Sequence, residues 1–539
     1  MQITLAQIDV VVGDIAGNVR RCRQAIVRAA NTGSRLVVCP ELCLLGYPPD
    51  DLLLRPDLHE RLQAGLDELM EAARDSGVAL IVGAPALDDG RLRNSAWILD
   101  GGRALGRADK RCLPNYGVFD EKRYFEPGAS PCVVEVDGRR IGVMVCEDMW
   151  DAAPARDLAA AGAEVMISLN ASPYHWGKRE DRRRIAATRV HETGLPLIYV
   201  NQVGGQDDLV FDGESFALAA DGTEVVGLPP FTEADARVVL EAGTDLRAAT
   251  GEVVPAAALG EAESIYRALT LGVRDYVGKN GFPGVVVGLS GGIDSALTLA
   301  VAVDALGPEA VTAVMMPSRY TAEMSLNDAA AEARALGVHY HVLSIESAFE
   351  AFNETLADVF AGHGRDITEE NLQARSRGVL VMALANKFNA LVLATGNKSE
   401  MAVGYATLYG DMCGGFAPLK DVDKTRVYRL ARWRNTQGEV IPERVITRAP
   451  SAELAEDQAD SDSLPPYEVL DPILEALVER DEAVEDLVAR GFAEADVRHV
   501  ARLLVRSEYK RRQAAPGPKV SPRAFGRERR YPITSRYSF

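Results

Sequence analysis

The sequence lacks the features of membrane proteins and of disulfide-rich proteins. No apolar run reaches about 18 residues, so we expect no transmembrane helix and no membrane partner. The seven cysteines include no CxxC pair, which argues against a disulfide framework or a zinc cage and favours a reducing cytoplasm. Cys39 and Cys43 have no second ligand pair, so we expect them to pack in a core. The first residues lack a basic region followed by an apolar stretch, and they predict a β-strand rather than a signal peptide.

Basic residues are outnumbered by acidic ones. The chain has 59 Lys and Arg against 78 Asp and Glu, which gives a net charge of −19. A field of this sign opposes general nucleic-acid binding, so we expect no nucleic-acid partner. The segment from Arg506 to the last residue is strongly basic by contrast. It is interpreted either as a solvated, partly extended tail or as an arm that contacts phosphate or another subunit.

A chain of 539 residues is too long for one hydrophobic core, so two or more domains are expected. Short apolar runs alternate with amphipathic stretches in both halves, which is typical of layered α/β proteins. The stretch around 242–261 is rich in Ala, Gly and Pro and has no clear period. We therefore predict a first domain at 1–245, a linker at 246–260 and a second domain at 261–539. In the second we expect a doubly wound parallel sheet and a mobile loop at 451–466.

The clearest motif is VVVGLSGGIDSAL, in which a buried strand leads through glycines into a helix. Free backbone N–H groups of such a loop and helix start form an anion site. No lysine follows the glycines, so this is not the GxxxxGK[ST] loop. Asp294 could hold Mg²⁺ on phosphate oxygens, or it could simply cap the helix. The candidate ATP-binding residues of the motif are Gly288, Leu289, Ser290, Gly291, Gly292, Ile293, Asp294 and Ser295.

LSGGIDSA resembles the pyrophosphate loop of the N-type ATP pyrophosphatases, which activate an acid by adenylation. Residues 367–386 and 391–428 further resemble the substrate helix and the following strand and loop of NAD synthetases. The resemblance implies an ATP contact at Thr395 and Mg²⁺ ligands at Asp294 and Glu400. It also implies that deamido-NAD⁺ is contacted by Asn371, Arg375, Glu400, Asp411, Lys420 and Lys510.

Each of these residues also has a simpler interpretation. Glu400 and Asp411 could be surface carboxylates, Arg375 could belong to an i,i+4 ion pair, and Lys510 could lie at a solvated helix end.

An amide-forming synthetase needs ammonia, and a fused glutaminase would release it close to its point of use. Residue 2 is Gln2, which excludes a nucleophile cysteine directly after the initiator Met, and no histidine of the first half lies in an HxE pattern. Three residues at expected strand ends, Glu41, Lys110 and Cys146, instead resemble the catalytic set of the nitrilase (carbon–nitrogen hydrolase) superfamily. That resemblance implies a four-layer α-β-β-α sandwich.

The chemistry of such a set requires these residue types. Cys146 would attack the glutamine carboxamide, Glu41 would move the proton, and Lys110 would stabilise the oxyanion and lower the thiol pKa. By itself, Cys146 could also be a buried core thiol. The resemblance further implies glutamine contacts at Tyr116, Glu121, Ser172 and Lys178. Core packing for Tyr116 and a strand-end cap for Ser172 are the simpler alternatives.

The resemblance extends over nearly the whole chain to the family of glutamine-dependent NAD synthetases. It implies the substrates glutamine, ATP and deamido-NAD⁺, a homo-oligomer that is often an octamer, and an internal ammonia path. Three alternatives remain. The chain could be a tRNA-modifying pyrophosphatase, although Cys413 is the only cysteine of its second half, and thiolating relatives use pairs. The first domain could be a non-catalytic binding module, or the amidated acid could be a different one.

Overall fold

The computed structural model describes residues 1–252, 258–450, 453–455 and 464–537. Within these limits the chain forms two compact units, Met1–Ala258 and Leu259–Phe539. Most of the loop expected at 451–466 lies outside the described residues. In the described part of the chain, none of the helices combines the length and apolar character that crossing a membrane requires.

Two sheets form the centre of the first unit. The first has the strand order β15-β14-β1-β2-β3-β4-β5 and the second has the order β13-β12-β9-β8-β7-β6. The strands of the first sheet are β1 (Gln2–Gln7), β2 (Leu36–Val38), β3 (Ala79–Asp88), β4 (Arg91–Asp100), β5 (Arg103–Asp109), β14 (Ala234–Leu240) and β15 (Leu246–Ala248). Those of the second are β6 (Cys132–Val136), β7 (Arg139–Val145), β8 (Val165–Asn170), β9 (Leu197–Asn201), β12 (Phe216–Leu218) and β13 (Glu224–Gly227), and a separate hairpin joins β10 (Val203–Gln206) to β11 (Leu209–Asp212).

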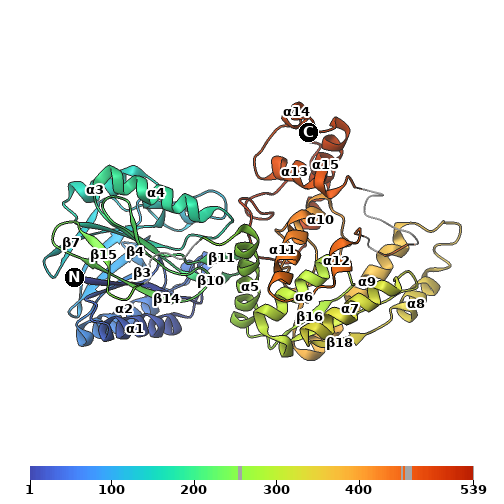
Figure 1. Ribbon diagram of the computed structural model, residues 1–539, viewed down its shortest axis with the longest axis horizontal. Helices are drawn as coiled ribbons and strands as arrows, with labels where there is room; N and C mark the ends of the chain where they lie inside the picture. The colour runs from blue at the N-terminus through green and yellow to red at the C-terminus, as the bar shows by residue number, and fades with distance from the viewer. Residues whose placement is uncertain (253–257, 451–452, 456–463, 538–539) are drawn as a thin grey trace. The chain divides into compact units, whose positions relative to one another are not determined.

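Helices cover both outer faces of this pair of sheets. Helices α1 (Ile15–Asn31) and α2 (Leu58–Ser76) lie on one side, and α3 (Ala152–Ala160) and α4 (Lys178–Thr193) lie on the other (Figure 1). The inward side chains of both sheets form one apolar core, which includes Ile3, Val38, Ile167 and Val200. The four-layer α-β-β-α sandwich is therefore confirmed. Strand β15 pairs with β14, so residues 246–248 belong to the sheet although the linker was expected to begin there.

The second unit is built on a parallel sheet with the order β18-β17-β16-β19. Its strands are β16 (Val285–Gly288), β17 (Val311–Met315), β18 (His339–Val342) and β19 (Leu391–Leu393). Helix α6 (Ile293–Leu306) contacts α5 (Glu261–Lys279), α7 (Glu323–Leu336) and α11 (Lys424–Thr436), while α8 (Glu346–Leu356) contacts α9 (Ile367–Phe388). Helix α9 packs over Val286, Val314 and Val392 of the sheet. The order and the connecting helices confirm the doubly wound α/β fold.

The last third of this unit is more helical than the sequence predicted. Helix α10 (Lys398–Val403) contacts α13 (Tyr467–Val478) and α15 (Glu494–Arg506), and α14 (Val484–Ala489) packs beside them (Figure 1). They share an apolar core that includes Leu470, Leu477 and Val497. The remaining short helices are α12 (Glu443–Thr447), α16 (Glu508–Arg511) and the 3₁₀ turns η1 (Asp50–Leu54), η2 (Glu121–Arg123), η3 (Cys146–Met149) and η4 (Pro308–Ala310).

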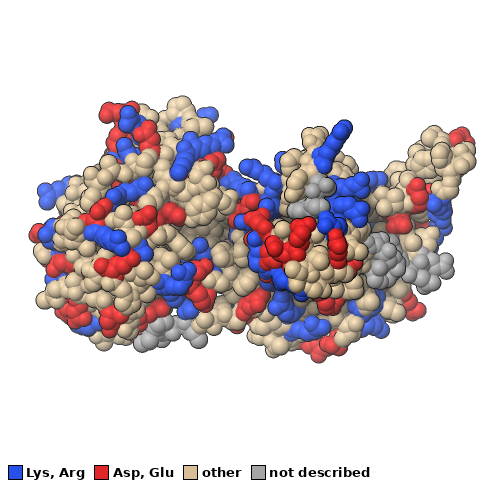
Figure 2. All heavy atoms as spheres, turned by 90° about the horizontal axis from the view of Figure 1, so that it is seen from above, with Lys and Arg blue, Asp and Glu red and all other residues tan. Residues whose placement is uncertain are grey.

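The basic C-terminal segment is not a solvated tail in the part from 512 to 529. Lys519 and Ser521 are buried, and Arg523 and Arg529 both pair with Asp481. The charged side chains of this part therefore largely pair with groups of the second unit. The face of the molecule in Figure 2 likewise shows basic and acidic side chains interspersed, without one large area of a single sign.

Candidate functional site

The three residues expected to carry amide hydrolysis meet at the strand ends of the first unit. Glu41 lies in the turn after β2, Lys110 directly follows β5, and Cys146 opens η3 directly after β7. The Lys110 ammonium donates to Glu41 Oε1 at 2.8 Å. Glu41 and Lys110 are 1% exposed and Cys146 is 4% exposed. A nearly dry ion pair therefore lies close enough to the thiol for both charges to act on it.

Further polar groups hold the Glu41 carboxylate. Asn94 Nδ2 donates to Glu41 Oε1 at 2.7 Å, and the backbone N–H of Ala171 donates to Oε2 at 2.8 Å. Glu121, expected as a glutamine contact, accepts from Lys110 Nζ at 2.7 Å and from the Tyr47 hydroxyl at 2.9 Å. Asn94 and Tyr47 were not predicted from the sequence. Asn94 is fully buried in β4, and a buried amide needs hydrogen-bond partners.

Opposing effects act on the pKa of the Cys146 thiol. Burial, and after it the charge of Glu41, raise this pKa well above its usual value. Lys110 lowers it, in the direction predicted from the sequence, but with a smaller effect, because desolvation dominates at this depth. The pKa of Lys110 is itself raised: burial opposes its charge, but Glu121 and Glu41 outweigh burial. The resting site thus contains a neutral thiol beside a charged lysine and needs a base.

The backbone at the nucleophile is held in an uncommon conformation. Cys146 has φ +47°, in the left-handed region that residues with a Cβ rarely adopt. Asp148 fixes this turn, because its carboxylate accepts from the N–H groups of Val145 at 3.1 Å, Arg111 at 2.9 Å and Cys112 at 2.7 Å. The turn after Lys110 is therefore tied to the turn that carries Cys146. The sequence analysis did not assign Asp148.

Tyr116 and Ser172 lie around this site in different ways. The Tyr116 hydroxyl donates to Glu147 Oε1 at 2.8 Å, and the side chain is exposed, so it is not a core residue. Ser172 is buried, and its hydroxyl accepts from Arg182 Nε at 3.1 Å. Arg182 in turn donates to both carboxylate oxygens of Asp212, at 2.7 and 2.8 Å. The Ser172 hydroxyl is thus oriented from inside the protein.

Lys178 is the first residue of α4, so its positively charged side chain lies at the N-terminus of a helix. Its ammonium lies 4.1 Å from the centre of the Trp150 ring. Burial, followed by the charge of Arg182, lowers the pKa of Lys178 to about 8. A lysine held in this way gains from an anionic partner, which is the kind of group a glutamine α-carboxylate would supply.

In the second unit, the glycine-rich loop joins β16 to α6. Ser295 Oγ accepts from the N–H of Ser290 at 3.1 Å and donates to the Gly292 carbonyl at 3.0 Å, so the turn is closed on itself. Gly291 has φ +79°, and a Cβ there would lie 2.4 Å from the Ser325 carbonyl oxygen. Only glycine fits this position.

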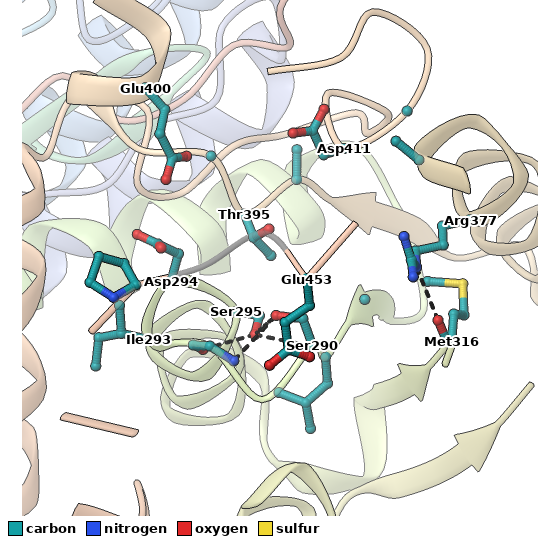
Figure 3. Close-up of a pocket in the computed structure, with 18 of the residues that line it drawn as sticks. Ser290, Ile293, Asp294, Ser295, Met316, Arg377, Thr395, Glu400, Asp411 and Glu453 are labelled. Carbon is teal, nitrogen blue, oxygen red and sulfur yellow. Dashed lines mark hydrogen bonds between the residues drawn. The ribbon is translucent and has the colours of Figure 1, made fainter. Parts of the chain in front are cut away.

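A cavity of about 280 Å³ opens over this loop (Figure 3). The candidate residues that line it are Gly288, Leu289, Ser290, Gly292, Ile293, Asp294, Ser295, Thr395, Glu400 and Asp411, while Gly291 supports the loop from behind. Arg377 and Met316, which also line the cavity, were not predicted from the sequence. Arg377 Nε donates to the Met316 carbonyl at 2.9 Å, and the pair lies across the pocket from Asp294 and Glu400 (Figure 3).

Asp294 and Glu400 converge on one cation, the buried ammonium of Lys424, which the sequence analysis did not assign. The ammonium donates to Asp294 Oδ2 and, at 3.3 Å, to Glu400 Oε1. Asn397 Nδ2 donates to Asp294 Oδ1 at 2.9 Å. The alternative that Asp294 caps the helix is wrong, because Gly292 is the N-cap residue of α6 and Asp294 lies within the helix. Burial opposes the charge of Lys424, yet the two carboxylates raise its pKa.

Two carboxylates that face one pocket fit Mg²⁺, which takes one or two carboxylates and completes its shell with phosphate oxygens and water. Among the described residues, no group of three or more metal-binding side chains offers a complete protein cage. The donor set therefore suits a metal that arrives with a nucleotide.

Four expected deamido-NAD⁺ contacts do not line this cavity. Asn371 Oδ1 accepts from the Thr407 hydroxyl at 2.9 Å, and Arg375 Nε donates to the Leu408 carbonyl at 3.2 Å. Lys510 donates to the carbonyls of Gly404 and Ala406, each at 2.7 Å, so it is not at a solvated helix end. Lys420 Nζ donates to the Ala515 carbonyl at 2.5 Å.

Three of these four residues thus surround the loop 404–411. Asp411, at its end, does line the cavity, and its side chain is exposed there.

Comparisons with known proteins match both units. A carbon–nitrogen hydrolase family model matches residues 2–248, and an NAD synthase family model matches residues 265–514. The glutamine-dependent NAD(+) synthetase of Xanthomonas campestris is 50% identical and that of Rhodobacter capsulatus is 49% identical. The alignments cover 100% and 99% of this chain, respectively, and 98% of each relative.

Solved structures agree with this result. The glutamine-dependent NAD⁺ synthetase from Acinetobacter baumannii, in complex with ADP, is 46% identical with a TM-score of 0.81. The match covers 99% of this chain and 98% of that one. The enzyme from Cytophaga hutchinsonii, at 22% identity and a TM-score of 0.85, supports the fold; its match also covers 99% of this chain and 98% of that one. The chain therefore belongs to the family of glutamine-dependent NAD(+) synthetases.

Proposed function

We propose that this chain converts deamido-NAD⁺ to NAD⁺, with ATP as the activating nucleotide and glutamine as the nitrogen source. The first unit hydrolyses glutamine, and the second forms the amide and releases AMP and pyrophosphate. The observation that carries the proposal is the buried Lys110–Glu41 ion pair beside Cys146, in a chain whose second unit holds a nucleotide-type loop.

In the first unit, Glu41 takes the proton from the Cys146 thiol, and the thiolate attacks the carboxamide carbon of glutamine. Lys110 stabilises the oxyanion, because it is buried and charged before the reaction begins. Glu41 returns the proton to the departing ammonia and then activates water against the thioester, which releases glutamate. The raised thiol pKa suits this sequence, because the thiolate forms only when the base acts.

Four further residues recognise glutamine. Lys178 pairs with the α-carboxylate, and Ser172, oriented by Arg182, binds the α-amino end. Tyr116 and Glu121 contact the rest of the substrate. Since the carboxylate of Glu121 already accepts from Lys110 and Tyr47, it also fixes the position of the charged lysine.

In the second unit, the N–H groups of the 288–295 loop bind the ATP phosphates, and Thr395 contacts the nucleotide. Asp294 and Glu400 would hold Mg²⁺, which when bound neutralises the charge of the phosphates and polarises them for transfer. The nicotinate carboxylate attacks the α-phosphorus and pyrophosphate leaves. Ammonia then attacks the acyl carbon and AMP leaves. Asn371, Arg375, Glu400, Asp411, Lys420 and Lys510 bind deamido-NAD⁺ directly or through the loop 404–411.

We also propose a homo-oligomer, with the octamer implied by the family resemblance as its expected form. Helix α9 and its neighbour α8 expose large apolar side chains, including Val379 at 62%, Phe388 at 45% and Phe352 at 45%. Such a surface is typical of a contact with a second copy. A cytoplasmic location fits the seven free cysteines. Light scattering of wild type and of Val379→Glu tests the assembly, and an unchanged mass would contradict this surface.

The function is tested with glutamine that carries ¹⁵N only in its side-chain amide. Wild-type protein with deamido-NAD⁺, ATP and Mg²⁺ should give NAD⁺ that contains ¹⁵N, and mass spectrometry should also find AMP and pyrophosphate. Absence of NAD⁺ with both glutamine and ammonium would show that the acid is a different one. If NAD⁺ forms with ammonium but not with glutamine, the first unit is not a glutaminase.

A further inference from the structure

The buried part of the basic C-terminal segment is hydrogen-bonded to a cluster of charged side chains beside the ATP pocket. Asp421 is 4% exposed and accepts from the N–H groups of Val520 and Ser521, each at 2.8 Å, and from the Ser521 hydroxyl at 2.8 Å. The Lys398 ammonium lies 3.0 Å from Asp421 Oδ1. It also donates to Ser521 Oγ at 2.6 Å and to Glu479 Oε1 at 2.7 Å. Ser521 is therefore the group shared by Asp421 and Lys398.

The contact between the C-terminal segment and the preceding loop is long and close. The N–H of Ala417 donates to the Pro516 carbonyl at 2.8 Å, and Lys420 Nζ donates to the Ala515 carbonyl at 2.5 Å. A Cβ on Gly517 would lie 2.0 Å from the Ala417 carbonyl oxygen. Residues 515–521 thus run along residues 417–421 at a distance that excludes a side chain at 517.

Asp421 and Lys398 lie close in sequence to residues that line the pocket. Asp421 precedes Lys424 by three positions, and Lys398 precedes Glu400 by two. The two segments are bonded to each other, because the N–H of Lys398 donates to the Val422 carbonyl at 2.8 Å and the N–H of Lys424 donates to Ser399 Oγ at 2.9 Å. A shift of either segment would therefore move the Lys424 ammonium relative to Asp294 and Glu400.

The cluster is also electrically constrained. Burial opposes the charge of Asp421, yet Lys398 and Lys519 lower its pKa, so both carboxylate oxygens stay available as acceptors. Removing one hydrogen-bonding group would leave buried charges short of a partner, which costs more than a neutral hydrogen bond. Movement of the segment would relieve this cost.

From these contacts we infer that Ser521, with Lys398 and Asp421, forms a positioning element for the ATP pocket. Through this element the C-terminal segment fixes the positions of Lys424 and Glu400. These positions in turn determine the rate of amide formation. None of the three touches a substrate in this scheme. The inference rests on the proposed role of Asp294, Glu400 and the 288–295 loop in ATP binding.

The test is the ammonium-driven formation of NAD⁺ by the full chain, in Ser521→Ala and in the matched variant Ser535→Ala. Ser535 is exposed in the same C-terminal segment. We expect Ser521→Ala to lower kcat by about 10- to 100-fold, the size of effect that a small misplacement near the chemistry produces. The KM for deamido-NAD⁺ should change less than kcat, because three of its expected contacts, Asn371, Arg375 and Lys510, are bonded to the loop 404–411 and not to the cluster. Ser535→Ala should behave as wild type.

Two further measurements keep the inference falsifiable. The unfolding transition of the second unit in chemical denaturation of the full chain reports whether each variant is folded, and Ser521→Cys, nearly isosteric but a weaker hydrogen-bonding group, should give an intermediate kcat. A folded Ser521→Ala or Ser521→Cys with wild-type kcat would overturn the inference, as would an equal loss of kcat in Ser535→Ala.

Asp294→Asn and Glu400→Gln distinguish the positioning role from the proposed ATP site. If these abolish activity while Ser521→Ala does not, only the positioning role fails; if they do not, the pocket itself is misassigned.

Discussion

The ammonium of Lys178 lies over the ring of Trp150, and burial lowers the pKa of this lysine to about 8. A lowered pKa means that Lys178 loses its charge as the pH rises through about 8. The neutral amine cannot pair with a carboxylate, so the KM for glutamine should rise above that pH, while below it the KM should be constant. Steady-state kinetics with glutamine between about pH 7 and 9 measures this.

Lys178→Arg provides the control for this prediction. Arginine keeps its charge throughout the range, so the rise in KM should disappear even if the affinity differs. A wild-type KM that stays constant to pH 9, or the same rise in Lys178→Arg, would exclude Lys178 as the group that binds the α-carboxylate.

Cys146→Ala should separate the two half-reactions. We expect glutamine-driven NAD⁺ formation to fall by at least about three orders of magnitude, because the covalent route is lost, while ammonium-driven formation remains. Cys132→Ala, which changes a partly buried cysteine of β6, is the matched control and should keep both rates. Continued use of glutamine by Cys146→Ala would mean that Cys146 is only a core thiol.

Asp148→Asn tests the support of the nucleophile turn. The amide cannot accept at both ends, so at least one of the N–H groups of Val145, Arg111 and Cys112 loses its acceptor. We expect the first unit to lose about 2 kcal/mol of stability, and glutaminase kcat to fall more than the KM for glutamine rises. Asp151→Asn, which retains an acceptor for the Ala153 N–H, should leave both unchanged. Equal stability of both variants in chemical denaturation would refute this role of Asp148.

Glu400→Gln should alter the metal requirement of amide formation. With one of two carboxylates neutralised, saturation of the ammonium-driven reaction should need a higher Mg²⁺ concentration, by about tenfold. Glu309→Gln, on the exposed turn η4, is the control and should match wild type. An unchanged Mg²⁺ titration in Glu400→Gln would remove Glu400 from the proposed metal ligands.

Local patterns were sufficient for much of the fold. The apolar runs that end at Cys39, Cys146 and Gly288 predicted β2, β7 and β16, because a short β-branched run bounded by turn residues has few alternatives. The same positions placed Glu41, Cys146 and the glycine loop at strand ends. What linked them was resemblance to known families, since spacing alone does not place Lys110 beside Glu41.

The parts that could not be predicted depend on contacts distant in sequence. Lys424 and Asp294 are 130 positions apart, and Asn94 lies 53 positions from Glu41. The helices after α12 were not predicted because their apolar faces are buried only by packing against each other and against α10. The raised pKa of the Cys146 thiol could not be predicted for a related reason, since burial, which outweighs the lowering by Lys110, is a property of the folded unit.

The contact of Asp421 with Val520 and Ser521 has a consequence for synthesis on the ribosome. All strands of the first unit lie within residues 2–248, so this unit can fold while the rest of the chain is still being made. The second unit must wait for Val520 and Ser521 before its charge cluster can close. A nascent or prematurely terminated chain would thus possess a complete hydrolase core attached to an unfinished ligase, and the ability to consume glutamine would be acquired before the ability to use its nitrogen.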